Sequence, residues 1–206
     1  MNDGLHIVSP LSLVPPVGLF VAMAKGHKLC FDEAEHYVKQ TIRNRYHILS
    51  ANGVQTLTIN VVGQKGEKVS TKNILIDYNE PWIRLHKRTL ESSYRSSPFF
   101  DHYYPKVMSL FEAGHPDLKT FFRESLRLWI GLLKFDPDYS IKDEYVEQEL
   151  DYDLRKRIKS PCQFPAEFQS KSYLQVFSDR FDFQPNLSVL DLLFNEGPAA
   201  LSVLKG

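Results

Sequence analysis

The N-terminal segment, residues 5–32, constrains the fold most, because it predicts a strand, a loop, a helix and a second strand in succession. Leu5–Val8 is a short apolar run typical of a buried strand. Prolines precede the apolar segment Val17–Lys25 and Gly26 follows it, as expected at the two ends of a helix. Lys28–Asp32 is the second strand. This order predicts a parallel β-α-β unit, and therefore an α/β fold.

An Asn-Gly pair marks a β-hairpin further along the chain. Asn52-Gly53 separates the strand-like runs Tyr46–Ser50 and Val54–Val62, and this dipeptide favours a tight turn between antiparallel strands. The second run alternates, with Leu57, Ile59 and Val61 on one face and Thr56, Thr58 and Asn60 on the other. Such alternation indicates a strand with one buried face. A further short strand is predicted over residues 73–77.

The rest of the chain is mainly helical in pattern. Helices are predicted over residues 80–94, capped by Asn79, and over residues 99–111 and 117–135. Near the end, Ser188 and Asp191 have the spacing of a capping box, and Gly197-Pro198 separates the last two helices. No repeat or linker divides the chain. We expect one domain over residues 1–206: a single-domain, three-layer Rossmann-like α/β sheet with a β-hairpin and a helical C-terminal half.

Composition excludes several classes of protein. Lys plus Arg and Asp plus Glu both number 25, whereas nucleic-acid binders usually carry a basic excess, so we expect no nucleic-acid partner. The apolar stretch Leu11–Ala24 contains prolines and is too short to span a bilayer, and no basic segment precedes it. We therefore expect no membrane span and a cytoplasmic location.

The sequence predicts no metal and no cofactor. Cys30 and Cys162 lie far apart, and neither has a Cys or His partner at metal-binding spacing, so both are expected to be free thiols. A glycine-rich phosphate loop is also missing from the sequence. The aromatic content of 13% leaves room for a homodimer interface without indicating one.

The polar tract from His36 to Arg45 is the strongest candidate for a binding site. Its cations Lys39, Arg43 and Arg45 could hold a phosphate or carboxylate, since arginine grips such groups with two parallel hydrogen bonds. Asn44 could orient a substrate hydroxyl. The alternative is a charged surface whose cations pair with nearby glutamates, Glu33 and Glu35. We expect a small anionic substrate at this tract.

His86 is the candidate for proton transfer. It shares a helical face with Trp82 and Leu90, so its side chain is expected to point inward or into a cleft. If His86 lines a cleft, it is the best-placed general acid or base, because an imidazole titrates near neutral pH. If it lies in the core, it is simply a hydrogen-bonded buried residue. The sequence leaves both interpretations open.

Three stretches in this order resemble the WbqC-like protein family: Glu35–Arg45, Ser93–Phe100 and Asn186–Pro198. The resemblance covers residues 5–204, and the last stretch is the most specific. The family is associated with bacterial polysaccharide gene clusters of the O-antigen type. The resemblance implies a role in surface polysaccharide biosynthesis, such as that of a transferase acting on a nucleotide-linked sugar.

The chain departs from the family pattern just after its first strand. Many members have His-Gln-Pro there, whereas this chain has Val8-Ser9-Pro10. A histidine at this place suits phosphate binding or acid-base chemistry, so its loss weakens the expectation of catalysis. The alternative is a non-catalytic binding or scaffold member of the same family. Whether the chain is an enzyme stays open at this point.

Overall fold

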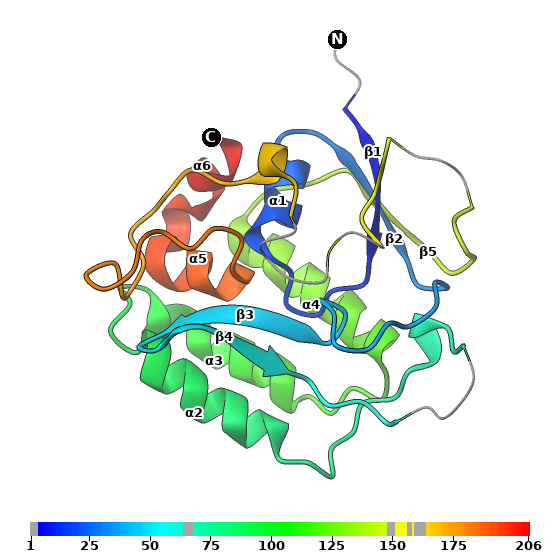
Figure 1. Ribbon diagram of the computed structural model, residues 1–206, viewed down its shortest axis with the longest axis horizontal. Helices are drawn as coiled ribbons and strands as arrows, with labels where there is room; N and C mark the ends of the chain where they lie inside the picture. Colours follow the sequence, from blue (N-terminus) through cyan, green and yellow to red (C-terminus); the bar gives the residue numbers. More distant parts are fainter. Residues whose placement is uncertain (1–3, 64–67, 148–150, 156–157, 159–163) are drawn as a thin grey trace.

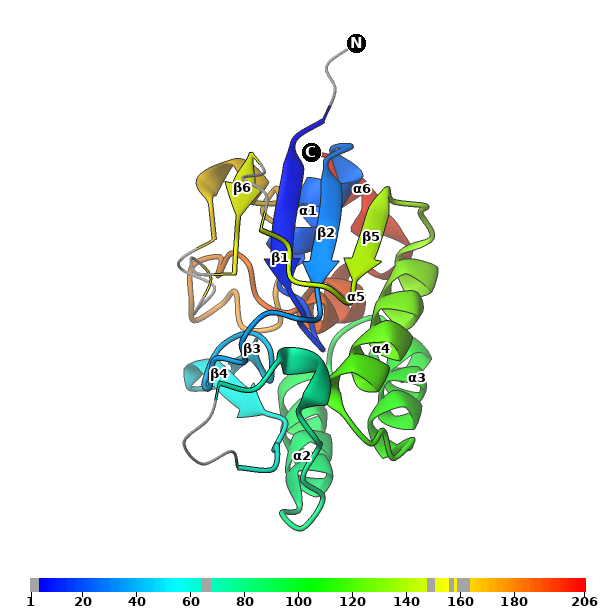
Figure 2. The same cartoon turned by 90° about the vertical axis from the view of Figure 1, so that its right-hand side faces the viewer.

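The computed structural model describes residues 4–63, 68–147, 151–155, 158 and 164–206. Four strands form a parallel sheet in the order β5-β2-β1-β6, namely β1 (His6–Pro10), β2 (Lys28–Asp32), β5 (Tyr139–Lys142) and β6 (Tyr152–Asp153). This order corresponds to the first four strands of a Rossmann-like sheet. Figure 2 shows β1, β2 and β5 side by side, with α1 (Val17–Ala24) and α6 (Ala200–Lys205) behind them. The predicted α/β fold class is confirmed.

The predicted β-α-β unit is present at the start of this sheet. α1 joins β1 to β2, and the parallel register places Ile7 opposite Leu29. Seven of the eight residues of α1 are buried, as its uncharged sequence VGLFVAMA requires. Gly26 follows the helix with a φ of +84°, a left-handed conformation that costs glycine little.

A long excursion between β2 and β5 carries the hairpin and three helices. Its elements are β3 (Arg45–Ser50), β4 (Gly53–Thr58), η1 (Thr71–Asn73), α2 (Trp82–Tyr94), α3 (Phe100–Glu112) and α4 (Leu118–Leu133). The hairpin turns at the predicted Asn-Gly pair, where Gly53 has a φ of +96°. In Figure 1 the hairpin crosses the middle of the molecule, with α2 and α3 below it.

Two predictions for the approach to α2 need correction. The strand predicted over residues 73–77 is reduced to isolated bridges at Leu75 and Ile76, because η1 takes up its beginning. Asn79 does not cap α2. The residue before the helix is Pro81, which makes no side-chain capping bond, and the backbone N–H of Asn79 donates to Asp77 instead.

The C-terminal region folds as α5 (Val189–Glu196), η4 (Gly197–Ala199) and α6, preceded by the short η3 (Ala166–Phe168). The predicted capping box of α5 is wrong. The Ser188 hydroxyl caps nothing, and it is buried without a partner among the described residues. The Asp191 carboxylate turns instead toward Tyr94 and Tyr173, whose hydroxyls donate to it at 2.8 and 2.7 Å, and toward the Gln175 amide at 2.8 Å. Three side-chain donors satisfy a buried carboxylate better than one backbone N–H.

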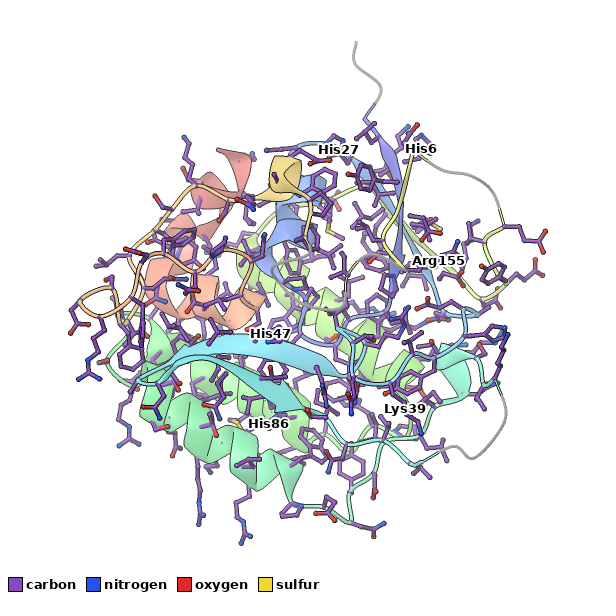
Figure 3. All side chains as sticks on the ribbon, viewed as in Figure 1. His6, His27, Lys39, His47, His86 and Arg155 are labelled. Atoms are coloured by element: carbon purple, nitrogen blue, oxygen red, sulfur yellow. The ribbon has the colours of Figure 1, made fainter. Side chains whose placement is uncertain are left out.

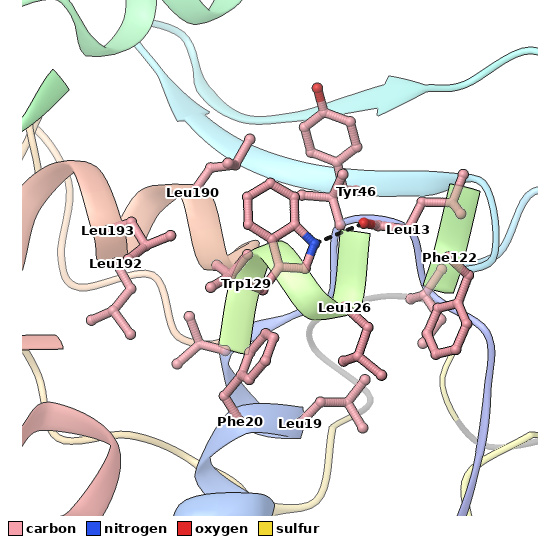
Figure 4. Close-up of a cluster of buried hydrophobic side chains, with 14 of the residues drawn as sticks. Leu13, Leu19, Phe20, Tyr46, Phe122, Leu126, Trp129, Leu190, Leu192 and Leu193 are labelled. Carbon is pink, nitrogen blue, oxygen red and sulfur yellow. Dashed lines mark hydrogen bonds between the residues drawn. The ribbon is translucent and has the colours of Figure 1, made fainter. Parts of the chain in front are cut away.

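One continuous cluster of buried hydrophobic residues includes parts of the sheet, the hairpin and all the longer helices. Figure 4 shows its centre, where Trp129 of α4 lies among residues of α1, β3 and α5. The Trp129 indole N–H donates to the backbone oxygen of Leu13 at 3.0 Å. Phe31 of β2 contacts Phe122 of α4, with ring centroids 4.9 Å apart. The helices of the excursion are thereby attached to the parallel sheet.

Strands β5 and β6 were absent from the sequence prediction. β5 (YSIK) carries only two hydrophobic side chains and both are partly exposed, while β6 is two residues long, so neither has the apolar run typical of a central strand. Cys30 is a free thiol, and Cys162 lies outside the described residues. No helix in the described ranges has both the length and the apolar character to cross a bilayer.

Candidate functional site

The carboxyl ends of the parallel strands are crowded with charged side chains. This is where open α/β sheets usually bind ligands, next to the strand at which the order reverses. Asp32 ends β2, is fully buried, and accepts a bond of 2.6 Å from Arg155, which follows β6. Arg155 also pairs with Asp153 at 2.7 Å and stacks over the Tyr145 ring. Its bonds to Asp153 and then Asp32 raise the pKa of the Arg155 guanidinium.

Arg43, one of the predicted anion-binding residues, is located at this same edge. It is only 1% exposed, and its Nε and Nη2 donate to the two carboxylate oxygens of Glu35 at 2.8 and 2.6 Å. Further bonds run to the Thr41 hydroxyl at 2.9 Å and the Arg155 carbonyl at 3.1 Å. The two guanidinium N–H groups that could bind a ligand carboxylate or phosphate already donate to the Glu35 carboxylate. Arg43 therefore fits the alternative interpretation of the polar tract, in which its cations pair with nearby glutamates.

A third ion pair completes the charged edge. Glu33 is fully buried and receives two bonds from Arg123 of α4, at 2.7 and 2.9 Å, with Lys119 at 3.7 Å. Val8, the residue at the position of the family histidine, is buried in β1, and its apolar side chain offers no hydrogen bond to a ligand. The cations described so far are therefore held by carboxylates of the chain itself.

A second polar region lies beside the hairpin, at a cavity of about 280 Å³. We call it the hairpin pocket and define it by the polar residues Lys39, Asn44, Arg45, Thr58, Asn60 and Asp77. It brings together three of the four residues predicted to bind substrate; Arg43 is the fourth and lies elsewhere. Figure 3 shows Lys39 near the end of the hairpin, well apart from Arg155.

A tight turn separates Arg43 from its neighbours Asn44 and Arg45. The Thr41 carbonyl accepts the N–H groups of Asn44 and Arg45 at 3.3 and 3.0 Å, and the preceding Gln40 has a φ of +61°. Within this turn Arg43 points to the sheet edge. Arg45 then begins β3 opposite Thr58 of β4, so its side chain is on the pocket side.

Arg45 differs from the cations at the sheet edge, because no described residue acts as its counterion. Its Nε is buried without a hydrogen-bond partner, and its guanidinium makes no ion pair with any residue in the described part of the chain. Its positive field contributes, after burial, to lowering the pKa of His47. Asn44 next to it is 6% exposed, donates to the Ile59 carbonyl at 3.0 Å, and has an Oδ1 that nothing described bonds.

The sequence prediction did not include Thr58, Asn60 or Asp77 in the site. A signal for the first two existed in the alternation of residues 54–62, which placed them on the polar face of the strand. Tyr37 also lines the pocket, and burial raises the pKa of its phenol to about 12, so the hydroxyl is neutral at pH 7. The pocket thus offers two cations, amide and hydroxyl groups, and one carboxylate.

His86 lies outside the pocket, in the core under the hairpin (Figure 3). It is fully buried, and burial lowers its pKa to about 4, so the ring is neutral at pH 7. Its Nε2 lies 3.0 Å from the Thr58 carbonyl and must carry the proton, while Nδ1 accepts from the Tyr46 hydroxyl at 3.1 Å. Both ring nitrogens are thus engaged, as the structural interpretation of His86 requires.

Known proteins place the chain in a family. The sequence model of the WbqC-like protein family matches residues 12–164. Among curated proteins, "Uncharacterized protein Rv1507c" of Mycobacterium tuberculosis is 26% identical, over 93% of this chain and 94% of that protein. No solved structure shows significant similarity. Within the described residues, no group of three or more His, Cys, Asp or Glu side chains is placed to hold a metal. With its match covering most of the sequence, this chain belongs to the WbqC-like protein family.

Proposed function

We propose that this protein binds a small molecule carrying a phosphate or carboxylate group in the hairpin pocket. Arg45 is the observation that supports this most directly. An arginine that lines a cavity with no carboxylate partner among the described residues presents its donors to whatever enters the cavity. Lys39 lines the same cavity and adds positive charge beside it. Binding an anion there would supply the counterion that Arg45 lacks among the described residues.

The other polar groups of the pocket suit a sugar. Thr58 and Asn60 offer a hydroxyl and an amide, and Asp77 offers a carboxylate, which together can accept and donate hydrogen bonds to several ligand hydroxyls. A volume of about 280 Å³ is at the small end of ligand sites and suits a sugar phosphate more closely than a whole nucleotide-linked sugar. We therefore propose an activated sugar of surface polysaccharide biosynthesis as the ligand class.

Binding without catalysis is the better-supported form of this proposal. His86 does not line the pocket, and both its ring nitrogens are engaged, one of them by the backbone carbonyl of Thr58, so it has no free position for proton transfer to a ligand. The family histidine is replaced by Val8, a buried residue whose apolar side chain cannot transfer a proton. Both facts favour a non-catalytic family member, which has kept a binding site but lost the histidine that could serve as acid or base.

Isothermal titration with inorganic phosphate, glucose 1-phosphate and UDP-glucose tests the binding proposal. We expect at least one of these to bind, and Arg45→Ala to weaken its Kd at least tenfold, which corresponds to about 1.4 kcal/mol. Arg127→Ala, which removes an exposed arginine of α4, should leave Kd unchanged. The proposal fails if all three compounds give no heat, or if the Arg45→Ala protein binds as tightly as wild type.

A transferase is the second candidate, because the pocket contains the carboxylate of Asp77. In such a reaction Asp77 would accept the proton of an acceptor hydroxyl while the hydroxyl oxygen attacks the sugar. The bond from the sugar to phosphate would break, and the nucleoside diphosphate would leave with both bonding electrons. The cations Lys39 and Arg45 would stabilise its charge.

Release of nucleoside diphosphate from nucleotide sugars separates the two candidates. A transferase should release it in the presence of a suitable hydroxyl acceptor, and Asp77→Asn should abolish release while leaving the Kd of the nucleotide sugar within about twofold. Binding that depends on Arg45 without any release supports the binding protein. Release that persists in Asp77→Asn rejects this role of Asp77.

A further inference from the structure

The outer edge of β4 has backbone groups that no described residue pairs with. In an antiparallel pair, residues of a non-hydrogen-bonded pair direct their N–H and C=O groups away from the partner strand. The His47 carbonyl accepts from Ser188 at 2.8 Å, on the side of β3 opposite β4. His47 is paired with Thr56, so Thr56 must face outward from β4. Val54 and Thr58, two residues away on either side, face outward as well.

The chain itself covers part of this edge and then leaves it. Asp77 donates to the Asn60 carbonyl and Val62 donates to the Leu75 carbonyl, both at 2.9 Å, so residues 75–77 lie along the edge as an antiparallel neighbour. After Asp77 the chain turns away to begin α2. The Thr58 carbonyl is taken by His86. The outward groups of Val54 and Thr56 are not paired with any described backbone, since β4 pairs with β3 alone.

A groove of about 410 Å³ runs along this open stretch, between β4 and α2. We call it the edge groove and define it by Thr56, Leu57 and Thr58 on one wall and Trp82, Arg84 and Arg88 on the other. The Trp82 indole N–H is buried and has no hydrogen-bond partner among the described residues. Trp82 as a whole is 2% exposed. The groove therefore combines an open strand edge, an apolar floor and a donor without an acceptor.

The charge of the groove is positive. Arg84 and Arg88 are exposed, lie one turn apart on α2, and form no ion pair with any residue that the structure describes. Glu80 is the acidic residue among those lining the groove. Two arginines one helical turn apart favour an acidic side chain at the same place.

We propose that the edge groove binds an extended peptide segment of a partner protein that carries acidic residues, as a third strand beside β4. The peptide backbone would pair with Val54 and Thr56, continuing the line of residues 75–77, which is the common mode of strand addition to an exposed edge. Its acidic side chain meets Arg84 and Arg88. A second copy of this chain fits less well, because β4 (GVQTLT) contains no acidic residue. This inference does not depend on the anion site, since it rests on the outward backbone groups of Val54 and Thr56 and on Arg84 and Arg88, although Thr58 lines both cavities.

Selection from a random peptide library displayed on phage, with the whole protein immobilised, tests this assignment. We expect enrichment of acidic peptides rich in β-branched residues, and binding of a synthetic copy of the most enriched peptide by fluorescence anisotropy. Thr56→Pro removes one outward N–H at a position where an edge strand tolerates proline, and should weaken that binding at least tenfold. Arg84→Glu/Arg88→Glu should do the same with the strand edge intact. Arg127→Glu/Lys171→Glu, two exposed cations outside the groove, is the matched control.

Several outcomes would overturn the proposal. One is a selection that enriches no peptides. Another is a set of peptides that bind the Thr56→Pro and the Arg84→Glu/Arg88→Glu proteins, each confirmed as folded by circular dichroism, as tightly as wild type. A third is a wild-type dimer in sedimentation velocity that dissociates in Thr56→Pro, because the edge would then be covered by a second copy.

Discussion

The charged edge of the parallel sheet and the hairpin pocket use the same residue types in opposite ways. At the sheet edge, Arg43 and Arg155 are almost enclosed and each meets a carboxylate of the chain at 2.6 Å. In the pocket, Arg45 has no such partner among the described residues. A buried cation needs a counterion to repay its loss of hydration, whereas a partly exposed one does not. The first arrangement holds the fold together, and the second leaves charge available to a ligand.

Arg43→Ala and Arg45→Ala test this contrast with one substitution at two positions. Removing Arg43 leaves the Glu35 carboxylate buried without its bidentate partner, which costs about 3–5 kcal/mol of unfolding free energy. Arg45→Ala should change the unfolding free energy by less than about 0.5 kcal/mol. Urea unfolding in the absence of ligand measures both. Equal losses for the two variants would contradict the division between the two regions.

Acid should destabilise the protein through His86, which is buried in the core under the hairpin. Its pKa is about 4 in the folded protein, against 6.5 for an unperturbed histidine, so the unfolded chain binds its proton more readily. The contribution of His86 to the unfolding free energy is therefore fully present above pH 6.5. It is lost as the pH drops toward 4, which lowers the unfolding free energy by up to roughly 3 kcal/mol.

Replacing His86 with glutamine should flatten the pH dependence of unfolding over the same range. Urea unfolding at pH 7, 5.5 and 4 gives the comparison, and His102→Gln controls for loss of an exposed histidine. The difference between wild type and His86→Gln should shrink as the pH falls. Parallel curves for the two proteins would show that His86 is not kept neutral by the fold.

Arg123→Ala should have an intermediate effect. Its partner Glu33 is fully buried, but the Arg123 side chain is 40% exposed and Lys119 remains 3.7 Å from the same carboxylate. Solvent screening and the second cation reduce the loss to about 1–2 kcal/mol. The double variant Arg123→Ala/Lys119→Ala should then lose more stability than the sum of the two single losses. Simple additivity would mean that Lys119 does not compensate.

The smallest effect is expected at α2. Arg84→Ala/Arg88→Ala removes two exposed cations that pair with no described residue, so the unfolding free energy should stay within about 0.5 kcal/mol of wild type. Thermal or urea unfolding measures it. A loss above about 1 kcal/mol would show that these arginines have a structural role like that of Arg43.

Local patterns predicted most of the elements correctly. The β-α-β start, the Asn-Gly hairpin and the helices over residues 80–94, 99–111 and 117–135 depend on periodicity and turn residues, which act over a few positions. β5 and β6 form only because β1 and β2 provide edges to pair with, and this long-range partner leaves little trace in four or two residues. The Asp191 capping box failed for a similar reason, since its partners Tyr94 and Tyr173 are distant in sequence.

The sequence predicted the region of the candidate site but not the position of each of its side chains. The polar tract indicated where cations gather, and Lys39, Asn44 and Arg45 do line one cavity. Which arginine points outward depends on the turn at Thr41 and on the position of Glu35, neither of which the composition of the tract reveals. The alternation of residues 54–62 indicated the polar face that carries Thr58 and Asn60, but that this face borders the cavity depends on the folded hairpin.

Both tryptophans of the chain are buried, but they have different surroundings. Trp129 is enclosed in the core and bonded to Leu13, while Trp82 also borders the edge groove. The fluorescence of both should therefore report global unfolding, and that of Trp82 should respond in addition to occupancy of the groove. A Trp129→Phe protein would emit from Trp82 alone, giving a label-free signal for whatever docks beside the hairpin.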